Sequence, residues 1–325
     1  MKHAGRPASM GHPQRFGCET LRAAPTVGDR LGYSRADQLA PARRFVAPRS
    51  FGRVGDLEVR MAAGHEEIRL AQALRYQVFY EEMAAQPSLT AQLRRRDEDP
   101  YDAVCDHLLV IDHAPDESSP WQHRRRPKVV GTYRVLRQQQ AEKSLGFYTQ
   151  GEYDIAPLIA RQRHDYRFME LGRSCVLKPY RNKRTVELLW HGLWTYVRTH
   201  KVDVMLGCAS FPGTDPDAHA APLSFMYHNA LASEKWRCRA HDELYVDMNR
   251  MGKDEVDPRT ALRAMPPLIK GYLRLGAMVG DGAVIDWQFG TTDVMIVLPV
   301  ENIDPRYFGH FGSPDEVKSR ISARD

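Results

Sequence analysis

The segment Met-Glu-Leu-Gly-Arg at residues 169–173 combines a carboxylate and a guanidinium in a setting that favours acid–base chemistry. It lies within residues 168–177, whose apolar side chains predict a strand. On such a strand Glu170 can face a cleft, where the loss of water raises the pKa of a carboxyl. A glutamate of this kind can act as a general base that removes a proton from an amine. The alternative is a buried ion pair of Glu170 with Arg173 or Arg134.

Two aspartates, Asp99 and Asp102, are spaced so that both lie on one face of a helical turn. Such a pair could receive the amines of a cationic amino acid. The alternative is an exposed acidic loop beside the basic run at residues 94–96. Arg134, on a predicted strand, could bind a carboxylate through two parallel hydrogen bonds, or it could form an internal ion pair with Asp102 or Glu170.

The histidines and cysteines do not have the spacing of a metal site. None of the 13 histidines belongs to an HExxH motif, and none of the five cysteines belongs to a CxxC pair. Cys175 and Cys208 fall in apolar segments, and we interpret them as thiols of the core. No glycine-rich dinucleotide turn or Walker loop is present. We therefore expect no metal and no nucleotide, and the scattered cysteines favour a reducing, cytoplasmic setting.

Basic charge is concentrated at the start of the chain. Residues 1–55 hold ten Lys/Arg and three acids, whereas the remainder holds 36 basic and 38 acidic side chains. The first segment lacks sustained periodicity, so we predict a basic, mostly disordered tail over 1–55. A transit peptide and an arm that contacts anionic lipid headgroups are the alternatives. The nearly neutral remainder argues against nucleic-acid binding.

Residues 56–325 are expected to form one domain of mixed α and β structure, with a C-terminal extension over 251–325. No apolar run reaches the ~18 residues that span a bilayer. Apolar runs and alternation predict strands near 57–61, 107–111, 129–136, 168–177, 203–210, 244–248, 284–289 and 294–300. Helical spacing predicts helices over 65–84, 186–197, 219–232 and 267–275, with Thr185 as the N-cap of the second.

Four segments, taken in order, resemble the acyl-homoserine lactone synthases. Residues 74–83 read Leu-Arg-Tyr-Gln-Val-Phe-Tyr-Glu-Glu-Met, and residues 97–110 read Asp-Glu-Asp-Pro-Tyr-Asp-Ala-Val-Cys-Asp-His-Leu-Leu-Val. Residues 130–136 read Val-Gly-Thr-Tyr-Arg-Val-Leu, and the fourth segment is 169–173. The resemblance implies an acetyltransferase-like (GNAT) fold, in which a mixed central sheet is flanked by helices.

Three later segments look like the L-ornithine Nα-acyltransferases, which make the lyso form of bacterial ornithine lipids. Residues 207–214 read Gly-Cys-Ala-Ser-Phe-Pro-Gly-Thr, residues 271–277 read Gly-Tyr-Leu-Arg-Leu-Gly-Ala, and residues 280–283 read Gly-Asp-Gly-Ala. The synthases usually carry a Trp where residues 83–85 read Met-Ala-Ala, which counts against a homoserine lactone product.

The resemblance assigns roles to individual residues. Arg75 and Phe79 match the synthases' helix motif, Asp99 and Asp102 match their paired acids, and Arg134 matches their strand arginine. Glu170 with Arg173 matches their Glu-x-x-Arg pair. We expect Glu170 to be catalytic and the other six residues to bind substrate. Tyr227 falls where related acetyltransferases place the acid that protonates the leaving thiolate, although it can also be a packed aromatic residue.

The resemblance also implies the acyl donor. In the implied fold the pantetheine arm enters between two diverging strands, here 168–177 and 203–210, where a backbone N–H meets the oxyanion. Enzymes that use coenzyme A hold its pyrophosphate in a glycine-rich loop at a helix N-terminus. The matching loop here contains Arg181, Lys183 and Arg184 and no glycine. These cations favour an acidic acyl carrier protein as the donor.

We therefore expect an N-acyltransferase that moves a 3-hydroxylated acyl chain from acyl carrier protein to the α-amine of L-ornithine. It would need no cofactor beyond the donor's phosphopantetheine. The alternatives are an acyl-homoserine lactone synthase and a non-catalytic binder of acidic partners. A cytoplasmic location is expected, with peripheral contact to the inner face of the membrane as a further option.

Overall fold

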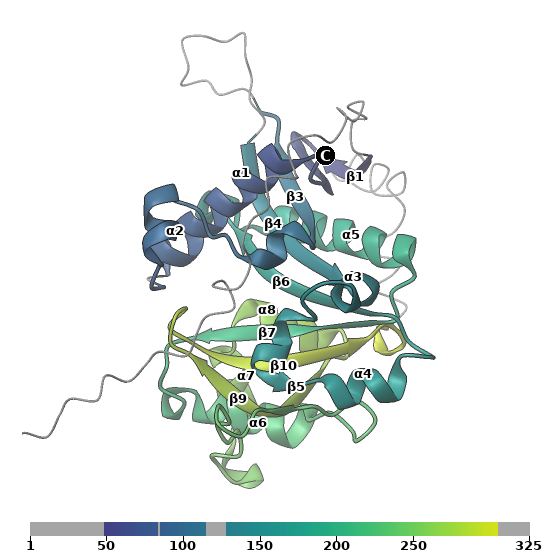
Figure 1. Cartoon of the computed structure of the whole chain (residues 1–325). Helices are drawn as coiled ribbons and strands as arrows, with labels where there is room; N and C mark the ends of the chain where they lie inside the picture. Colours follow the sequence, from purple (N-terminus) through teal and green to yellow (C-terminus); the bar gives the residue numbers. More distant parts are fainter. Residues whose placement is uncertain (1–48, 84, 115–127, 305–325) are drawn as a thin grey trace, which may run out of the picture. The chain divides into compact units, whose positions relative to one another are not determined.

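A mixed sheet runs through the residues that the computed structural model describes, which are 49–83, 85–114 and 128–304 (Figure 1). Its ten strands are β1 (Ser50–Val54), β2 (Leu57–Met61), β3 (Asp106–Asp112), β4 (Lys128–Arg137), β5 (Tyr153–Asp154), β6 (Phe168–Val176), β7 (Val204–Pro212), β8 (Arg239–Ala240), β9 (Met278–Asp286) and β10 (Thr291–Pro299). They lie in the order β1-β2-β3-β4-β6-β7-β10-β9-β8-β5. Neighbours are antiparallel except for the parallel pairs β6–β7 and β8–β9.

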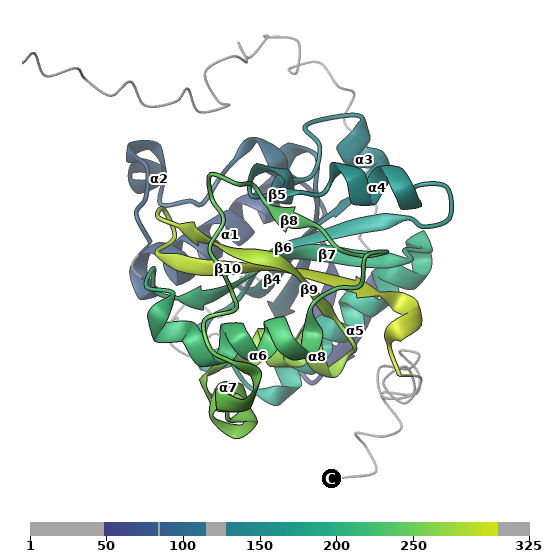
Figure 2. The same ribbon diagram turned by 90° about the horizontal axis from the view of Figure 1, so that it is seen from below.

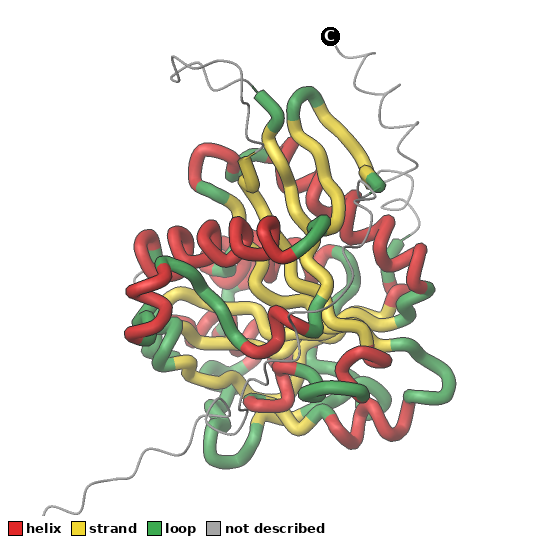
Figure 3. The backbone as a smooth tube through the Cα atoms, turned by 45° about the horizontal axis from the view of Figure 1, so that its top comes forward, coloured by secondary structure: helices red, strands yellow, loops and turns green. Residues whose placement is uncertain are grey.

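Helices cover both faces of this sheet, as Figure 3 shows. They are α1 (His65–Tyr76), α2 (Leu89–Arg94), α3 (Gln138–Glu142), α4 (Ala156–Gln162), α5 (Lys183–His200), α6 (Ala220–Ala230), α7 (Pro258–Ala264) and α8 (Pro267–Arg274). Figure 2 shows α3 and α4 on one side of the strands and α6 and α8 on the other. Among the helices of the described ranges, none has the length and apolar character that crossing a membrane requires.

The long helix α5 lies close against the sheet because Gly192 faces it. A Cβ at this position would clash with the side chain of Val59 on β2. Most of the apolar stripe predicted for this helix is confirmed, since Leu189, Leu193 and Val197 are buried, but Val186 at its start is exposed. The helix therefore anchors the N-terminal half of the sheet.

Strands β6 and β7 diverge part-way along their length. Their parallel pairing ends at Glu170 and Leu206, although both strands continue for six more residues. Gly207 stands where the pairing ends, with a φ of 149°, and a Cβ there would clash with the carbonyl oxygen of Leu171. The expectation that these two strands would be diverging neighbours is confirmed.

Two predicted helix boundaries differ from the structure. The helix expected over 65–84 ends as an α-helix at Tyr76 and continues as a π-helix over Gln77–Glu82, a wider turn that is common at functional sites. The N-cap of α5 is Asn182, whose side-chain oxygen accepts a hydrogen bond from the backbone N–H of Thr185. Thr185 therefore lies inside the first turn and is not the cap.

Three further boundaries also differ. β1 occupies Ser50–Val54 and pairs with β2, so the ordered domain begins before residue 56, while residues 1–48 of the predicted tail lie outside the described residues. The strand predicted at 244–248 is reduced to a single bridge between Val246 and Ala283. β9 begins at Met278, earlier than the expected 284.

Candidate active site

A cavity of about 680 Å³ lies where β6 and β7 diverge. Its wall comes from these two strands, the π-helix Gln77–Glu82, α5, α8 and the turn between β9 and β10. Apolar side chains in the wall include Val78, Phe79, Leu189, Trp190, Leu268 and Tyr272. The charged side chains in the wall are Arg134, Arg173, Arg181, Glu152, Glu170, Asp286 and Asp293. Such a cavity can hold an apolar chain together with a charged group.

Glu170 lies in this wall and is held by backbone donors. Its Oε2 accepts the N–H of Tyr148 at 2.7 Å, and its Oε1 accepts the N–H of Thr149 at 2.6 Å and the hydroxyl of Thr149. Burial raises the pKa of Glu170, although the bonds from Thr149 oppose this rise. A carboxylate has about four acceptor positions, so one remains for a substrate proton. The ion pair with Arg134 or Arg173 considered above is not the arrangement found.

The predicted acids Asp99 and Asp102 belong to a network of ion pairs with arginines. Arg134 Nη1 lies 2.6 Å from Asp99 Oδ1 and 3.2 Å from Asp102 Oδ1. Arg75 Nη2 lies 2.8 Å from Asp102 Oδ2. Although burial opposes it, the charge of Arg75 lowers the pKa of Asp102 well below its usual range. Neither acid is part of the cavity wall, and each is paired with arginines of the protein itself.

Arg173 joins this network from a β-bulge. Its φ is 50°, and the register between β4 and β6 shifts beside it. The guanidinium pairs with Asp97 and Asp99, both at 3.2 Å. It also lies over the rings of Tyr148 and Phe289, at 4.9 and 4.8 Å from their centroids. The bulge therefore directs a fixed cation into the cavity wall.

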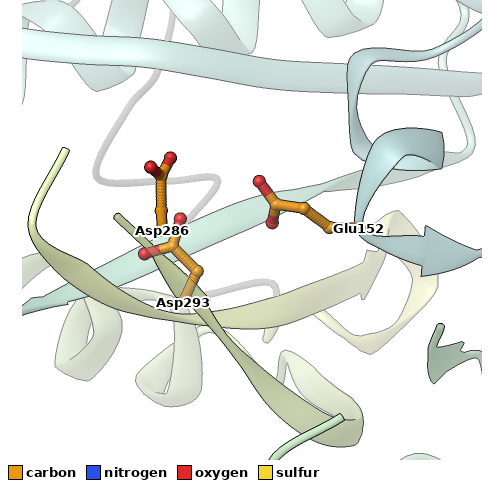
Figure 4. Close-up of side chains that lie close together, drawn as sticks. All are labelled: Glu152, Asp286 and Asp293. Atoms are coloured by element: carbon orange, nitrogen blue, oxygen red, sulfur yellow. The ribbon is translucent and has the colours of Figure 1, made fainter. Parts of the chain in front are cut away.

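Three further carboxylates, from Glu152, Asp286 and Asp293, converge in the cavity wall (Figure 4). One oxygen of each lies within 4.8 Å of the others. Glu152 precedes β5, Asp286 ends β9, and Asp293 lies in β10. Burial and the charge of Asp293 raise the pKa of Glu152 to about 7. Burial raises the pKa of Asp293 to about 6.

This group, here called the acidic triad, was not predicted from the sequence. Its members lie up to 141 positions apart, so no local spacing connects them. One signal was available at Asp293, which directly precedes the apolar run 294–300. A strand that is buried on both faces carries a charged residue only at a cost, so such a residue indicates a binding role.

Some of the remaining predicted residues line the cavity, and others do not. Phe79 lines the cavity from the π-helix, whereas Arg75 is buried beneath it among the aspartates. Tyr227 on α6 is not part of the wall, and its ring packs edge-on against His228, 5.3 Å away. This position gives no support for Tyr227 as the acid that protonates a thiolate.

The three basic residues at the start of α5 also differ in whether they line the cavity. Arg181 lines the cavity and pairs with Glu82 at 2.6 Å. Lys183, whose side chain is 81% exposed, and Arg184 are on the surface outside it. These three cations therefore extend from the cavity edge onto the outer surface.

Comparisons with known proteins support a common origin. A family model described as "Acetyltransferase (GNAT) domain" matches residues 74–191. The L-ornithine N(alpha)-acyltransferase of Agrobacterium fabrum (strain C58 / ATCC 33970) is 53% identical over 266 residues, which cover 82% of this chain and 88% of that protein. The protein of the same name from Brucella abortus (strain 2308) is 52% identical over 262 residues, which cover 81% of this chain and 91% of that protein. The chain belongs to the L-ornithine N(alpha)-acyltransferase family.

As a member of the L-ornithine N(alpha)-acyltransferase family, the chain is an acyltransferase, and the expected GNAT-like fold is confirmed. Among solved structures, an N-acyl amino acid synthase from uncultured soil microbes matches with a TM-score of 0.40 and 10% identity, covering 75% of this chain and 91% of that chain. The cavity between the diverging strands is the candidate active site of this acyltransferase.

Proposed function

We propose that the protein transfers an acyl chain from acyl carrier protein to the α-amine of L-ornithine, which gives lyso-ornithine lipid. The observation that carries this proposal is the cavity between β6 and β7, which combines an apolar wall with acids and arginines. The names of the curated relatives support ornithine as the acceptor. The site of an N-acyltransferase must hold a long apolar chain beside an amino acid, and this wall offers both surfaces.

The charged residues of the wall suit the chemistry of amide formation. Glu170 takes a proton from the α-ammonium, which is mostly protonated at neutral pH. The free amine attacks the thioester carbon, and the oxyanion meets backbone N–H groups of β6 beyond Glu170, where the pairing with β7 has ended. The thiolate then leaves and takes one of the two protons on the attacking nitrogen, so the amide nitrogen keeps the other, and Glu170 releases its own proton to solvent. Arg134 and Arg173 border the same space and can attract the carboxylate of the amino acid.

Acyl carrier protein is the donor that the surface around α5 favours. Helix α5 begins at Lys183 after the cap Asn182, without a glycine-rich loop that could hold the pyrophosphate of coenzyme A. Arg181, Lys183 and Arg184 instead offer positive charge to an acidic carrier. The donor brings its own phosphopantetheine, so we propose that the enzyme needs no further cofactor.

The test is tandem mass spectrometry of the products formed by the purified protein from 3-hydroxyacyl carrier protein and one amine at a time. We expect ornithine to be acylated at the α-nitrogen, lysine to react more slowly, and norvaline to be nearly inert. A lactone formed from a methionine-adenosyl donor would favour the acyl-homoserine lactone synthase. No thioester cleavage with any amine would favour a binder of acidic partners.

A further inference from the structure

The acidic triad is built for a positive ligand. Asp293, with only 6% of its surface exposed, lies on β10 between β7 and β9. Its Oδ1 has no hydrogen-bond partner among the described residues, and neither has Oε2 of Glu152. Figure 4 shows the three carboxylates converging on a common space. Buried carboxylate oxygens without partners are costly, and a cation in this space would offset that cost.

A fourth oxygen, which is not acidic, lies in the same part of the cavity wall. Thr291, two residues before Asp293 on β10, is 4% exposed and lines the cavity. Its hydroxyl forms no well-aligned hydrogen bond among the described residues, but its interaction with the carboxyl of Asp293 opposes the rise in the pKa of that carboxyl. A hydroxyl oxygen can accept a hydrogen bond as well as donate one, so it adds an acceptor to the triad.

The protein does not neutralise these acids with its own arginines, as it does for Asp97 and Asp99. The positive charge of Arg173 acts to lower the pKa of both Glu152 and Asp293. Its Nε and Nη2 donate to Asp97 and Asp99 instead. The triad therefore keeps an excess of negative charge facing the cavity.

We propose that Glu152, Asp286 and Asp293 form the subsite that receives the side-chain ammonium of the acceptor amino acid. This inference rests on the proposed function, because it specifies which end of ornithine each part of the cavity holds. It also reassigns the role that the sequence suggested for Asp99 and Asp102. An ammonium carries three N–H donors, which match the acceptors that the three carboxylates present.

An ammonium fits this site better than a divalent metal. Asp286 Oδ1 already accepts the backbone N–H groups of Gln288 and Phe289, at 2.8 and 2.9 Å, so it is held in a turn. Magnesium completes its octahedral shell partly with water, so the loss of activity in EDTA, tested below, is what distinguishes a metal from an ammonium. A single ammonium needs fewer oxygen acceptors than a metal ion does. Because the charge of Arg173 already offsets part of the negative charge of the triad, a ligand with one positive charge suits this site.

The triad also lies close to the point where β6 and β7 part. The Cys208 thiol contacts Glu152, and Cys208 follows Leu206, the last β7 residue paired with β6, by two residues. The triad and Glu170 line the same cavity, so one acceptor molecule in it can contact both.

The test compares ornithine with norvaline, which is ornithine without the side-chain amine. We measure kcat and KM for both acceptors with wild-type protein, Glu152→Gln and Asp293→Asn. We expect the wild-type ratio of kcat/KM, ornithine over norvaline, to be about 10²-fold or more. In each variant the ratio should fall by about tenfold or more, mainly through a higher KM for ornithine. Glu66→Gln is the matched control, because the Glu66 side chain is 86% exposed on α1.

The pH dependence of KM is a second measurement, and it would not change in the variants if the triad had only a structural role. Glu152 is surrounded by Asp293, Asp286, Cys208 and Arg173, and its carboxyl must ionise to bind an ammonium. The KM for ornithine should therefore fall as the pH rises from 6 to 8 in wild-type protein, while the KM for norvaline should not. Glu152→Gln should flatten this dependence.

The possible outcomes separate the two proposals. If wild-type protein does not acylate ornithine, the proposed function fails. If it acylates ornithine but both variants keep the wild-type ratio, the ammonium subsite is overturned. An equal loss of kcat with both amines would make Glu152 a general base and overturn the subsite as well. A requirement for magnesium or calcium, seen as loss of ornithine acylation in EDTA, would identify a metal site instead.

Discussion

Two groups of acids lie near the same cavity and differ in their partners. Asp97, Asp99 and Asp102, which do not line the cavity, pair with Arg75 and with the two wall residues Arg134 and Arg173. The acidic triad of Glu152, Asp286 and Asp293 lies in the wall itself. The charges of arginine lower the pKa of Asp97 and Asp102 despite burial, whereas burial raises the pKa of Glu152 and Asp293.

This difference separates acids that stabilise the fold from acids that are available to a ligand. A buried carboxylate with arginine partners holds segments together, because removing either member leaves an uncompensated charge. The network joins α1, the segment around Asp97 and strands β4 and β6, so it supports the bulge that carries Arg173. A buried carboxylate without such a partner destabilises the empty site, and that cost is offset when a cation binds.

The largest effect is expected at Glu170, which belongs to neither group because its partners are two backbone N–H groups and the Thr149 hydroxyl. Glu170→Gln keeps the shape and removes the base, so kcat should fall by ~10²–10⁴ if Glu170 deprotonates the α-amine. Steady-state kinetics with ornithine and acyl carrier substrate measure this change. Near-normal turnover in a folded Glu170→Gln protein would remove Glu170 from the mechanism.

The second-largest effect is a difference in stability between variants of the two groups of acids. Asp102→Asn should lower the free energy of unfolding by about 3–5 kcal/mol, because Arg75 and Arg134 lose a buried partner. Asp293→Asn at pH 8 should cause no comparable loss, since it removes a buried charge that has no arginine partner. Urea denaturation of the two variants without ornithine measures the difference. Equal losses would show that both groups stabilise the fold in the same way.

The two groups should also give opposite slopes of stability against pH. The pKa of Glu152 is raised from an ordinary 4.5 to about 7, so its contribution is complete below pH 4.5 and is lost as the pH rises through 7. The pKa of Asp102 is lowered, so its contribution is present above its ordinary 3.8 and is lost as the pH falls through its depressed value. The stability gained in Glu152→Gln relative to wild type should therefore grow between pH 4.5 and 7, as measured by urea denaturation without ornithine. A constant difference across this range would show that Glu152 does not titrate there.

The smallest effect concerns surface cations outside the cavity. Lys183→Ala combined with Arg184→Ala should raise the KM for acyl carrier substrate several-fold and reduce its dependence on salt, because exposed charges act through screened attraction. The bond of Arg181 with Glu82 is left intact. Arg198→Ala, an exposed cation at the other end of α5, is the matched control. An unchanged KM and salt slope in the double variant would place the carrier elsewhere.

Local pattern was sufficient to predict much of the framework. The apolar segments near 107–111, 129–136 and 168–177 form β3, β4 and β6, and the stripe over 186–197 forms the buried face of α5. Glu170 was predicted correctly as a strand residue, and it lines the cavity. These features follow from side-chain alternation and helical spacing, which depend on neighbours within a few residues.

Which acids face the cavity was decided only by the tertiary structure. Asp99 and Asp102 looked available in the sequence, but the fold brings Arg75 from α1 and Arg134 from β4 against them. The sequence around Asp293 gave only a weak sign of a binding role. Whether Asp293 faces the cavity depends on the placement of β10 between β7 and β9. Sheet order brings together residues from distant parts of the chain, and burial with or without a partner then decides the charge state of each carboxyl. The sequence by itself therefore determined the strands and the principal helix, whereas long-range packing decided which carboxylates remain free to bind a substrate.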